Sequence, residues 1–129
     1  MGVPRTNVIR VVLADDDPGF LDALATAMET DGRFEIVGLA GNGMEAFQLG
    51  CWQDPDVVVM DVNMPRLGGI EAARLLRQSR PGSRVLLVSS EAPEVLAHCA
   101  TGVADRIMPK ADLYEVLESV AQLAGRRRA

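Results

Sequence analysis

A chain of 129 residues with 48% hydrophobic and 24% charged residues can form one globular domain with a real core, and is too short for a second domain of ordinary size. Its net charge of −5 argues against direct nucleic-acid binding, and no apolar run approaches the roughly 20 residues that cross a membrane. With no apolar leader and two cysteines that fit no disulfide framework, we expect a cytoplasmic protein.

Short apolar runs alternate with amphipathic runs along the whole chain. The predicted strands are 8–14, 34–40, 57–60, 84–89 and 105–108. The predicted helices are 18–31, 43–51, 67–78, 93–100 and a last one that includes 113–121. Strands that alternate with helices predict an α/β fold: a doubly wound (βα)5 unit with five parallel strands, commonly in the order 2-1-3-4-5.

Some expectations concern the ends and faces of the helices. Asp17 followed by Pro18 is typical of an N-cap with proline at the first helical position, and we favour that role for Asp17 over metal binding. In the helix 43–51, we expect Met44 and Phe47 to point inward. The clearest amphipathic stripe lies on the last helix, at Leu113, Val116, Leu117, Val120 and Ala121.

Polar side chains follow four of the predicted strands where each strand ends. Asp15 and Asp16 follow the first strand and Asp61 the third; Ser89 ends the fourth, and Lys110 follows the fifth. Parallel strands share one carboxyl edge, and strands 1 and 3 are neighbours, so we expect the three carboxylates to converge. Each residue alone has an ordinary structural explanation, as a turn or surface residue, but their joint placement favours a site. Lys110 is also the single lysine among 13 basic residues.

The residue types at this edge indicate phosphoryl chemistry. Clustered carboxylates raise one another's pKa unless a cation is present, and oxygen ligands without histidine or cysteine suit Mg²⁺ (or Mn²⁺). A carboxylate can act as a nucleophile and form an acyl phosphate. The metal and Lys110 would then neutralise charge on the transferring group.

Four motifs occur in order: LADDDP at 13–18, VVVMDVNMP at 57–65, LLVSS at 86–90 and MPK at 108–110. Together they resemble the receiver domain of response regulators, the flavodoxin-like (CheY-like) module of two-component signalling. Within that family, the chain resembles the receivers of NarL/LuxR-type regulators. It covers about 7–124 and leaves 125–129 as a basic tail or the start of a linker.

The resemblance implies a role for each polar position. Asp61 would accept a phosphoryl group from a sensor histidine kinase in a Mg²⁺-dependent reaction and so switch protein–protein interactions. The chain would not be an enzyme beyond its own phosphorylation and dephosphorylation. The other implied roles are metal binding at Asp15, Asp16, Asp61 and the Asn63 backbone carbonyl, and phosphoryl contact by Ser89 and Lys110.

One position departs from the family pattern. Ile107 stands where the family usually has an aromatic residue that rotates with the hydroxyl switch, so the readout of phosphorylation is expected to differ. The helix at 93–100 is expected to be short, and the loop around it the most variable region. A homodimer would use the family's usual surface of the fourth helix, fifth strand and fifth helix.

Other functions remain open from the sequence. The chain could be the N-terminal receiver of a DNA-binding transcriptional regulator, or a pseudo-receiver that only binds proteins. A flavodoxin-like cofactor binder is disfavoured, because three aspartates after the first strand would repel a flavin phosphate. His98, the single histidine, has no supporting acid that would favour a phosphohistidine role.

Overall fold

The computed structural model describes residues 8–92, 101–110 and 112–126. The strands are β1 (Ile9–Ala14), β2 (Phe34–Ala40), β3 (Val57–Asp61), β4 (Arg84–Ser89) and β5 (Arg106–Pro109). The helices are α1 (Pro18–Asp31), α2 (Gly43–Gln53), α3 (Gly69–Ser79) and α5 (Leu113–Ala124). β2, β4 and α1 have the predicted bounds, and the ends of the other strands and of α2 and α3 differ from prediction by one or two residues. The predicted helix 93–100, with His98, lies outside the described residues.

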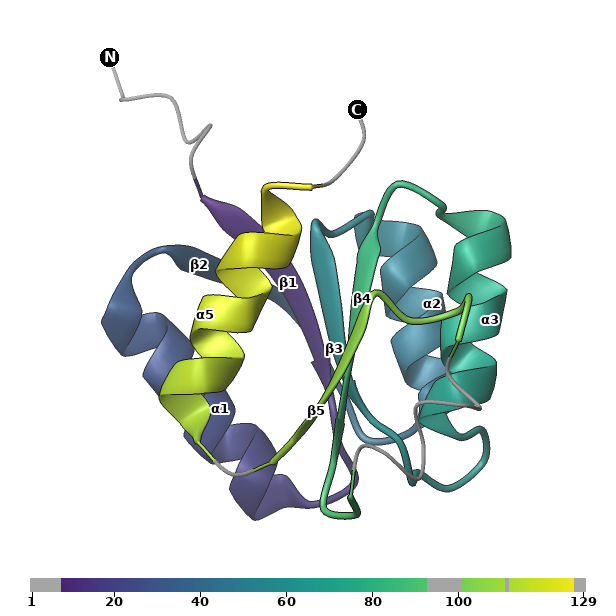
Figure 1. The fold of residues 1–129 in the computed structure, drawn as a ribbon, viewed down its shortest axis with the longest axis horizontal. Helices are drawn as coiled ribbons and strands as arrows, with labels where there is room; N and C mark the ends of the chain where they lie inside the picture. Colours follow the sequence, from purple (N-terminus) through teal and green to yellow (C-terminus); the bar gives the residue numbers. More distant parts are fainter. Residues whose placement is uncertain (1–7, 93–100, 111, 127–129) are drawn as a thin grey trace.

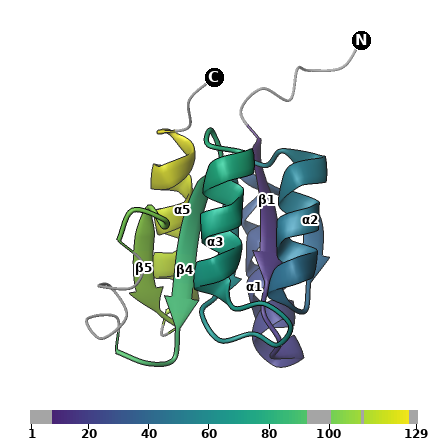
Figure 2. The ribbon, with the colours of Figure 1, turned by 90° about the vertical axis from the view of Figure 1, so that its right-hand side faces the viewer.

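The strands form one parallel sheet in the order β2-β1-β3-β4-β5, which confirms the predicted doubly wound topology. Figure 1 shows α1 and α5 on one face of this sheet and α2 and α3 on the other, and Figure 2 shows α2 and α3 from their own side. The carboxyl ends of the strands share one edge, opposite the edge where β1 begins and α5 ends (Figure 1). No helix in the described ranges combines the length and apolar character needed to span a bilayer.

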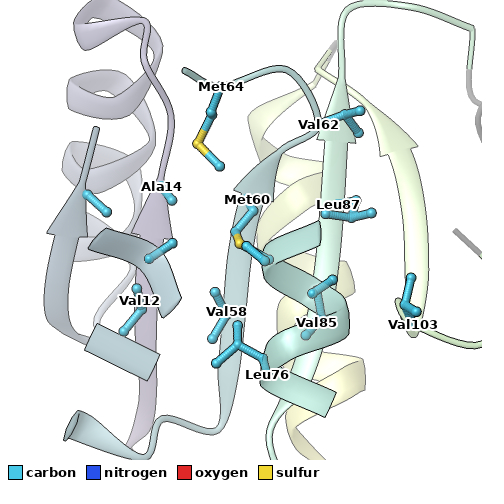
Figure 3. Packing of buried hydrophobic residues seen from close by; sticks show 14 residues of the cluster. Val12, Ala14, Val58, Met60, Val62, Met64, Leu76, Val85, Leu87 and Val103 are labelled. Carbon is cyan, nitrogen blue, oxygen red and sulfur yellow. The ribbon is translucent and has the colours of Figure 1, made fainter. Parts of the chain in front are cut away.

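The sheet is buried on both faces because its strands alternate between two apolar clusters. In β1, Val12 and Ala14 pack on the α2/α3 side, whereas Val11 and Leu13 pack on the α1/α5 side. The central strands follow the same alternation, and Figure 3 shows the α2/α3 side of it. Continuous apolar runs in the sequence therefore mark strands covered by helices on both faces.

Aspartate side chains cap the N-termini of α1 and α5, and the cap of α1 is the one that the sequence predicted. The Asp17 side chain accepts hydrogen bonds from the backbone N–H groups of Gly19 and Phe20, and Pro18 occupies the first position of α1. This confirms Asp17 as an N-cap. Asp112 caps α5 in the same way, with a hydrogen bond from the Tyr114 backbone. The start of α1, immediately after the Asp15–Asp16 pair, is therefore firmly placed.

The inward placement of Met44 is wrong, because this side chain is 38% exposed. The buried face of α2 is formed by Gly43, Ala46 and Gly50, while Phe47 packs against the α2/α3-side core as expected. Met44 follows Gly43, so its side chain points about 100° away from the buried direction of Gly43 around the helix axis. Small residues face α3 because the two helices approach closely.

At Gly43 the backbone of α2 lies close to the backbone of a neighbouring loop. A Cβ atom there would lie 2.0 Å from the backbone carbonyl oxygen of Leu67, in the loop that leads from β3 to α3. Neither backbone can move without disturbing α2 or the β3–α3 loop. Only glycine fits this position, which ties the start of α2 to a loop beside the carboxyl edge of the sheet.

Gly43→Ala is expected to lower the free energy of unfolding by about 3 kcal/mol, because the added methyl group overlaps a backbone atom. Gly41→Ala is the matched control: a Cβ there meets only the end of the Glu45 side chain at 3.7 Å. The control should stay within about 0.5 kcal/mol of the wild type. Urea unfolding measures both, and equal stabilities for the two variants would contradict the close packing at Gly43.

Candidate functional site

The carboxyl edge of the sheet brings Lys110 to two buried aspartates. The Lys110 Nζ atom lies 2.7 Å from Asp15 Oδ2 and 3.4 Å from Asp61 Oδ2. Asp15 follows β1 and Asp61 ends β3, its neighbour in the sheet, whereas Lys110 follows the edge strand β5. A backbone hydrogen bond from Lys110 N–H to the Ser89 carbonyl, 3.0 Å long, holds the lysine beside the end of β4.

Asp16 completes a cluster of three acids. Asp15, Asp16 and Asp61 each offer one carboxylate oxygen, and these oxygens lie within 4.8 Å of one another. Asp15 and Asp61 are buried but Asp16 is exposed, so the cluster opens to solvent on the Asp16 side. The convergence expected from the strand order is therefore present.

The hydrogen bonds of Asp15 test whether this cluster suits a metal ion. Its Oδ1 atom accepts a 2.8 Å hydrogen bond from the Asp17 backbone N–H. Its buried Oδ2 atom lies 2.7 Å from the Lys110 ammonium, which is its one polar partner among the described residues. Buried polar atoms normally have partners, and an under-satisfied carboxylate oxygen next to two further acids fits a hard divalent cation.

The protonation equilibria of Asp61 and Lys110 are both shifted. Burial and the nearby charge of Asp15 raise the Asp61 pKa above its usual value, against the opposing effect of Lys110 and of a hydrogen bond from the Asn63 backbone. Burial by itself would lower the Lys110 pKa. The hydrogen bond and charge of Asp15, with the charge of Asp61, outweigh that effect and raise the pKa of Lys110. The ammonium therefore stays charged at neutral pH.

Ser89 lies at the same edge of the sheet, as the last residue of β4. Its side chain is fully buried, and its Oγ atom accepts a 2.9 Å hydrogen bond from the Glu91 backbone N–H. The Glu91 carboxylate in turn accepts a 2.9 Å hydrogen bond from the Asn63 side-chain amide. This pair of contacts links the loop after β4 to the loop after β3, and holds the Ser89 oxygen toward Glu91.

The loop after Asp61 turns sharply under the site. Gly69 N–H donates a 2.8 Å hydrogen bond to the Val62 carbonyl, and a Cβ at Gly69 would lie 2.2 Å from the Asp61 carbonyl oxygen. Beside this loop is an open groove of about 540 Å³ whose lining includes Asp16 and Asn63. The acidic cluster is thus reachable from solvent through the groove.

Two neighbours of the site carry no functional signal in the sequence. Glu91 follows Ser89 by two residues and belongs to no motif. Phe20 reads as a core residue of α1, yet its ring centroid lies 4.7 Å from Lys110 Nζ. Ile107, three residues before the lysine, packs against the α2/α3-side core. Only the spatial arrangement identifies Glu91 and Phe20.

The family comparison covers most of the chain. Residues 11–121 match the sequence model of the response regulator receiver domain. Among characterised relatives, the transcriptional regulatory protein MctR of Rhizobium johnstonii is 34% identical over 119 residues, which are 91% of this chain and 56% of MctR. The probable transcriptional regulatory protein NarL of Mycobacterium tuberculosis is 30% identical over 126 residues, 96% of this chain and 58% of NarL. The chain therefore spans little more than half the length of these relatives.

Solved structures show the same fold. The signal receiver domain of the Mycobacterium tuberculosis NarL protein superposes with a TM-score of 0.86 at 30% identity, covering 94% of this chain and 99% of that one. The Thermotoga maritima response regulator TrrA, solved in complex with Mg²⁺ and BeF, superposes with a TM-score of 0.81 at 26% identity, covering 90% and 99%.

Asp61→Asn is expected to stabilise the folded chain at neutral pH in the absence of metal. A carboxyl pKa raised above 3.8 means that the folded state resists ionisation, so the wild type loses stability as pH rises from 3.8 through the raised pKa. Asparagine removes that loss. Urea unfolding at several pH values from about 4 to 7 should show a stability difference that grows with pH. Asp22→Asn, an exposed site on α1, is the control, and a variant no more stable than the wild type at pH 7 would contradict the assignment.

Proposed function

This chain belongs to the family of response regulator receiver domains, and we propose that it acts as a phosphoryl-accepting switch with Asp61 as the acceptor. Receiver domains are in general regulatory modules without an enzymatic activity of their own, they interact with sensor histidine kinases, and they bind Mg²⁺ at an acidic pocket. The observation that carries the proposal is the position of Lys110, whose ammonium lies between Asp15 and Asp61 beside the three-acid cluster.

Among the three acids, Asp61 is best placed to be the nucleophile. Asp15 is held at both oxygens, by the Asp17 backbone and by the Lys110 ammonium, and Asp16 is the exposed member. Asp61 makes the longer contact with Lys110 and adjoins the groove through its own loop. An Asp61 oxygen would form the bond to phosphorus while the bond from phosphorus to the donor's nitrogen or oxygen breaks, the donor leaving with that electron pair.

The charge of the site suits a phosphoryl group once a metal is present. The residues that would hold Mg²⁺ are the carboxylates of Asp15, Asp16 and Asp61 and the backbone carbonyl of Asn63. Bound there, the ion would supply the positive charge that offsets the carboxylates and the transferring group. Lys110 would contribute a compact point charge to the phosphoryl oxygens.

Ser89 is proposed to sense the phosphoryl group. Its Oγ accepts a hydrogen bond from Glu91 N–H, so its own proton remains available for donation. Donation to a phosphoryl oxygen on Asp61 would pull Ser89 away from Glu91 and strain the Glu91–Asn63 hydrogen bond. The loop after β4 would then move without the aromatic rotation that position 107 cannot provide.

We further propose that the switch controls transcription. The relatives MctR and NarL are transcriptional regulators of which this chain matches a little over half. The receiver described here would then control an output function carried by other residues or by a partner. A pseudo-receiver that binds proteins without phosphorylation is the alternative, and the complete set of three acids, hydroxyl and lysine favours the phosphorylated form.

Incubation with acetyl phosphate and Mg²⁺ is expected to add the mass of one phosphoryl group to the chain. Asp61→Asn should abolish this addition, because the nucleophilic oxygen is lost, while Asp22→Asn should retain it. Intact-mass spectrometry measures both. Absence of any addition from small donors and from a cognate kinase would favour the pseudo-receiver.

Mg²⁺ binding is expected to depend on Asp16 and not on its neighbour. Asp16→Asn should weaken Mg²⁺ affinity at least about tenfold, because a carboxylate of the cluster is lost. Asp17→Asn removes the same charge one residue away and keeps an N-cap oxygen, so its affinity should change little. Isothermal titration calorimetry compares the variants, and equal losses in both would show a general charge effect instead of a metal site.

A further inference from the structure

Phe20 makes a contact with the site that its position in α1 does not suggest. The Lys110 Nζ atom lies 4.7 Å from the centroid of the Phe20 ring, within the range of cation–π attraction. Three groups thus attract the ammonium: the Asp15 carboxylate, the Asp61 carboxylate and the negative face of the Phe20 ring. Phe20 is one of five aromatic residues in the chain, and the other ring with a cationic partner among the described residues is Phe34, under Arg33.

The place of the ring is fixed by the same backbone that fixes Asp15. Phe20 N–H donates to the N-cap oxygen of Asp17, and Asp17 N–H donates to Asp15 Oδ1. Phe20 also packs against the α1/α5-side core. A ring held at both the helix start and the core cannot follow the lysine, so it acts as a fixed surface for a flexible four-carbon chain.

The attraction of the two carboxylates for the ammonium would change when the site binds a metal ion and when Asp61 is phosphorylated. Both are proposed metal ligands, and Asp61 is the proposed acceptor, so their negative charge would be shared with the ion and then with the phosphoryl group. The Phe20 ring takes no part in either event. Its attraction for the ammonium would persist while the other two weaken.

We propose that Phe20 is a positioning residue for phosphoryl transfer: its ring keeps the Lys110 ammonium at the site while the carboxylates bind the metal and react. This inference rests on the proposed function. It explains why a partly buried aromatic residue in the first turn of α1 faces the single lysine of the chain.

The first test compares substitutions at Phe20. Phe20→Leu keeps an apolar side chain in the core but removes the aromatic face, and should slow phosphorylation by a small donor in saturating Mg²⁺ by about twofold to tenfold. Phe20→Tyr keeps the face and should stay within about twofold of the wild type. Phe34→Leu is the matched control. It deletes the other cation–π ring, which lies at the amino-terminal end of β2, away from the site, and it should not alter the rate.

A graded series keeps the test decisive if Phe20→Leu folds poorly. Site-specific incorporation of phenylalanines with one and then three ring fluorines at position 20 weakens the negative face of the ring and changes its size little. The transfer rate should fall with each step. A rate that is independent of fluorination would show that Phe20 only fills space and would overturn the proposal.

The single lysine provides a readout that does not need phosphorylation. Lysine labelled with ¹³C at its terminal methylene gives one side-chain NMR signal, from Lys110. Its protons should appear at lower chemical shift in the wild type and in Phe20→Tyr because of the ring current, and move toward the free-lysine value in Phe20→Leu.

A wild type that takes no phosphoryl group overturns the proposed function and the catalytic part of this inference. A phosphorylated wild type matched by Phe20→Leu in both rate and NMR signal overturns the role of Phe20 alone.

Discussion

An ammonium group between two buried carboxylates is the interaction on which this site depends. Asp15 and Asp61 are brought together by neighbouring strands and would repel each other strongly without a cation. Lys110 compensates part of that charge, yet the Asp61 pKa remains raised, because one ammonium cannot offset three carboxylates. The site is therefore under-neutralised, and that imbalance is what a divalent cation and a phosphoryl group can together resolve.

The parallel sheet is what allows such an unfavourable cluster to form. Both of its faces are covered by helices, so every strand is anchored by apolar contacts that do not involve the site. The polar residues lie at or just after the carboxyl ends of the strands, as Asp61 and Ser89 do at the last positions of β3 and β4, where they do not interrupt the core. Glycines then bring the connecting loops close: Gly43 admits the Leu67 carbonyl, and Gly69 lies against the Asp61 carbonyl. Stability from the core and chemistry at the edge are thus carried by different residues.

Two side-chain contacts relate the site to the rest of the fold. The Glu91–Asn63 hydrogen bond joins the loops after β4 and β3, on the side where Ser89 lies. On the other side, the Phe20 ring connects Lys110 to the first turn of α1. Ile107 packs against the α2/α3-side core, and neither of these two contacts involves it. The switch proposed for this chain therefore depends on the loop after β4.

The sequence by itself predicted the strands and helices and the Asp17 cap, because they follow from apolar periodicity and local capping. The strand order, and with it the convergence of Asp15, Asp16 and Asp61, was predicted from the order that five-stranded folds of this kind commonly adopt. The sequence also marked Lys110, through its position after the last strand. It could not determine that Met44 is exposed, since helix periodicity does not reveal that Gly43 packs against the loop before α3 and that Gly50 packs against Leu76 of α3. Nor could it reveal that Glu91 contacts Asn63, which is 28 residues away in the sequence. The contact between Phe20, on α1, and Lys110, after β5, was hidden for the same reason. Only the tertiary structure decided these, because they depend on the distances between loops and helices that the chain brings together from distant positions.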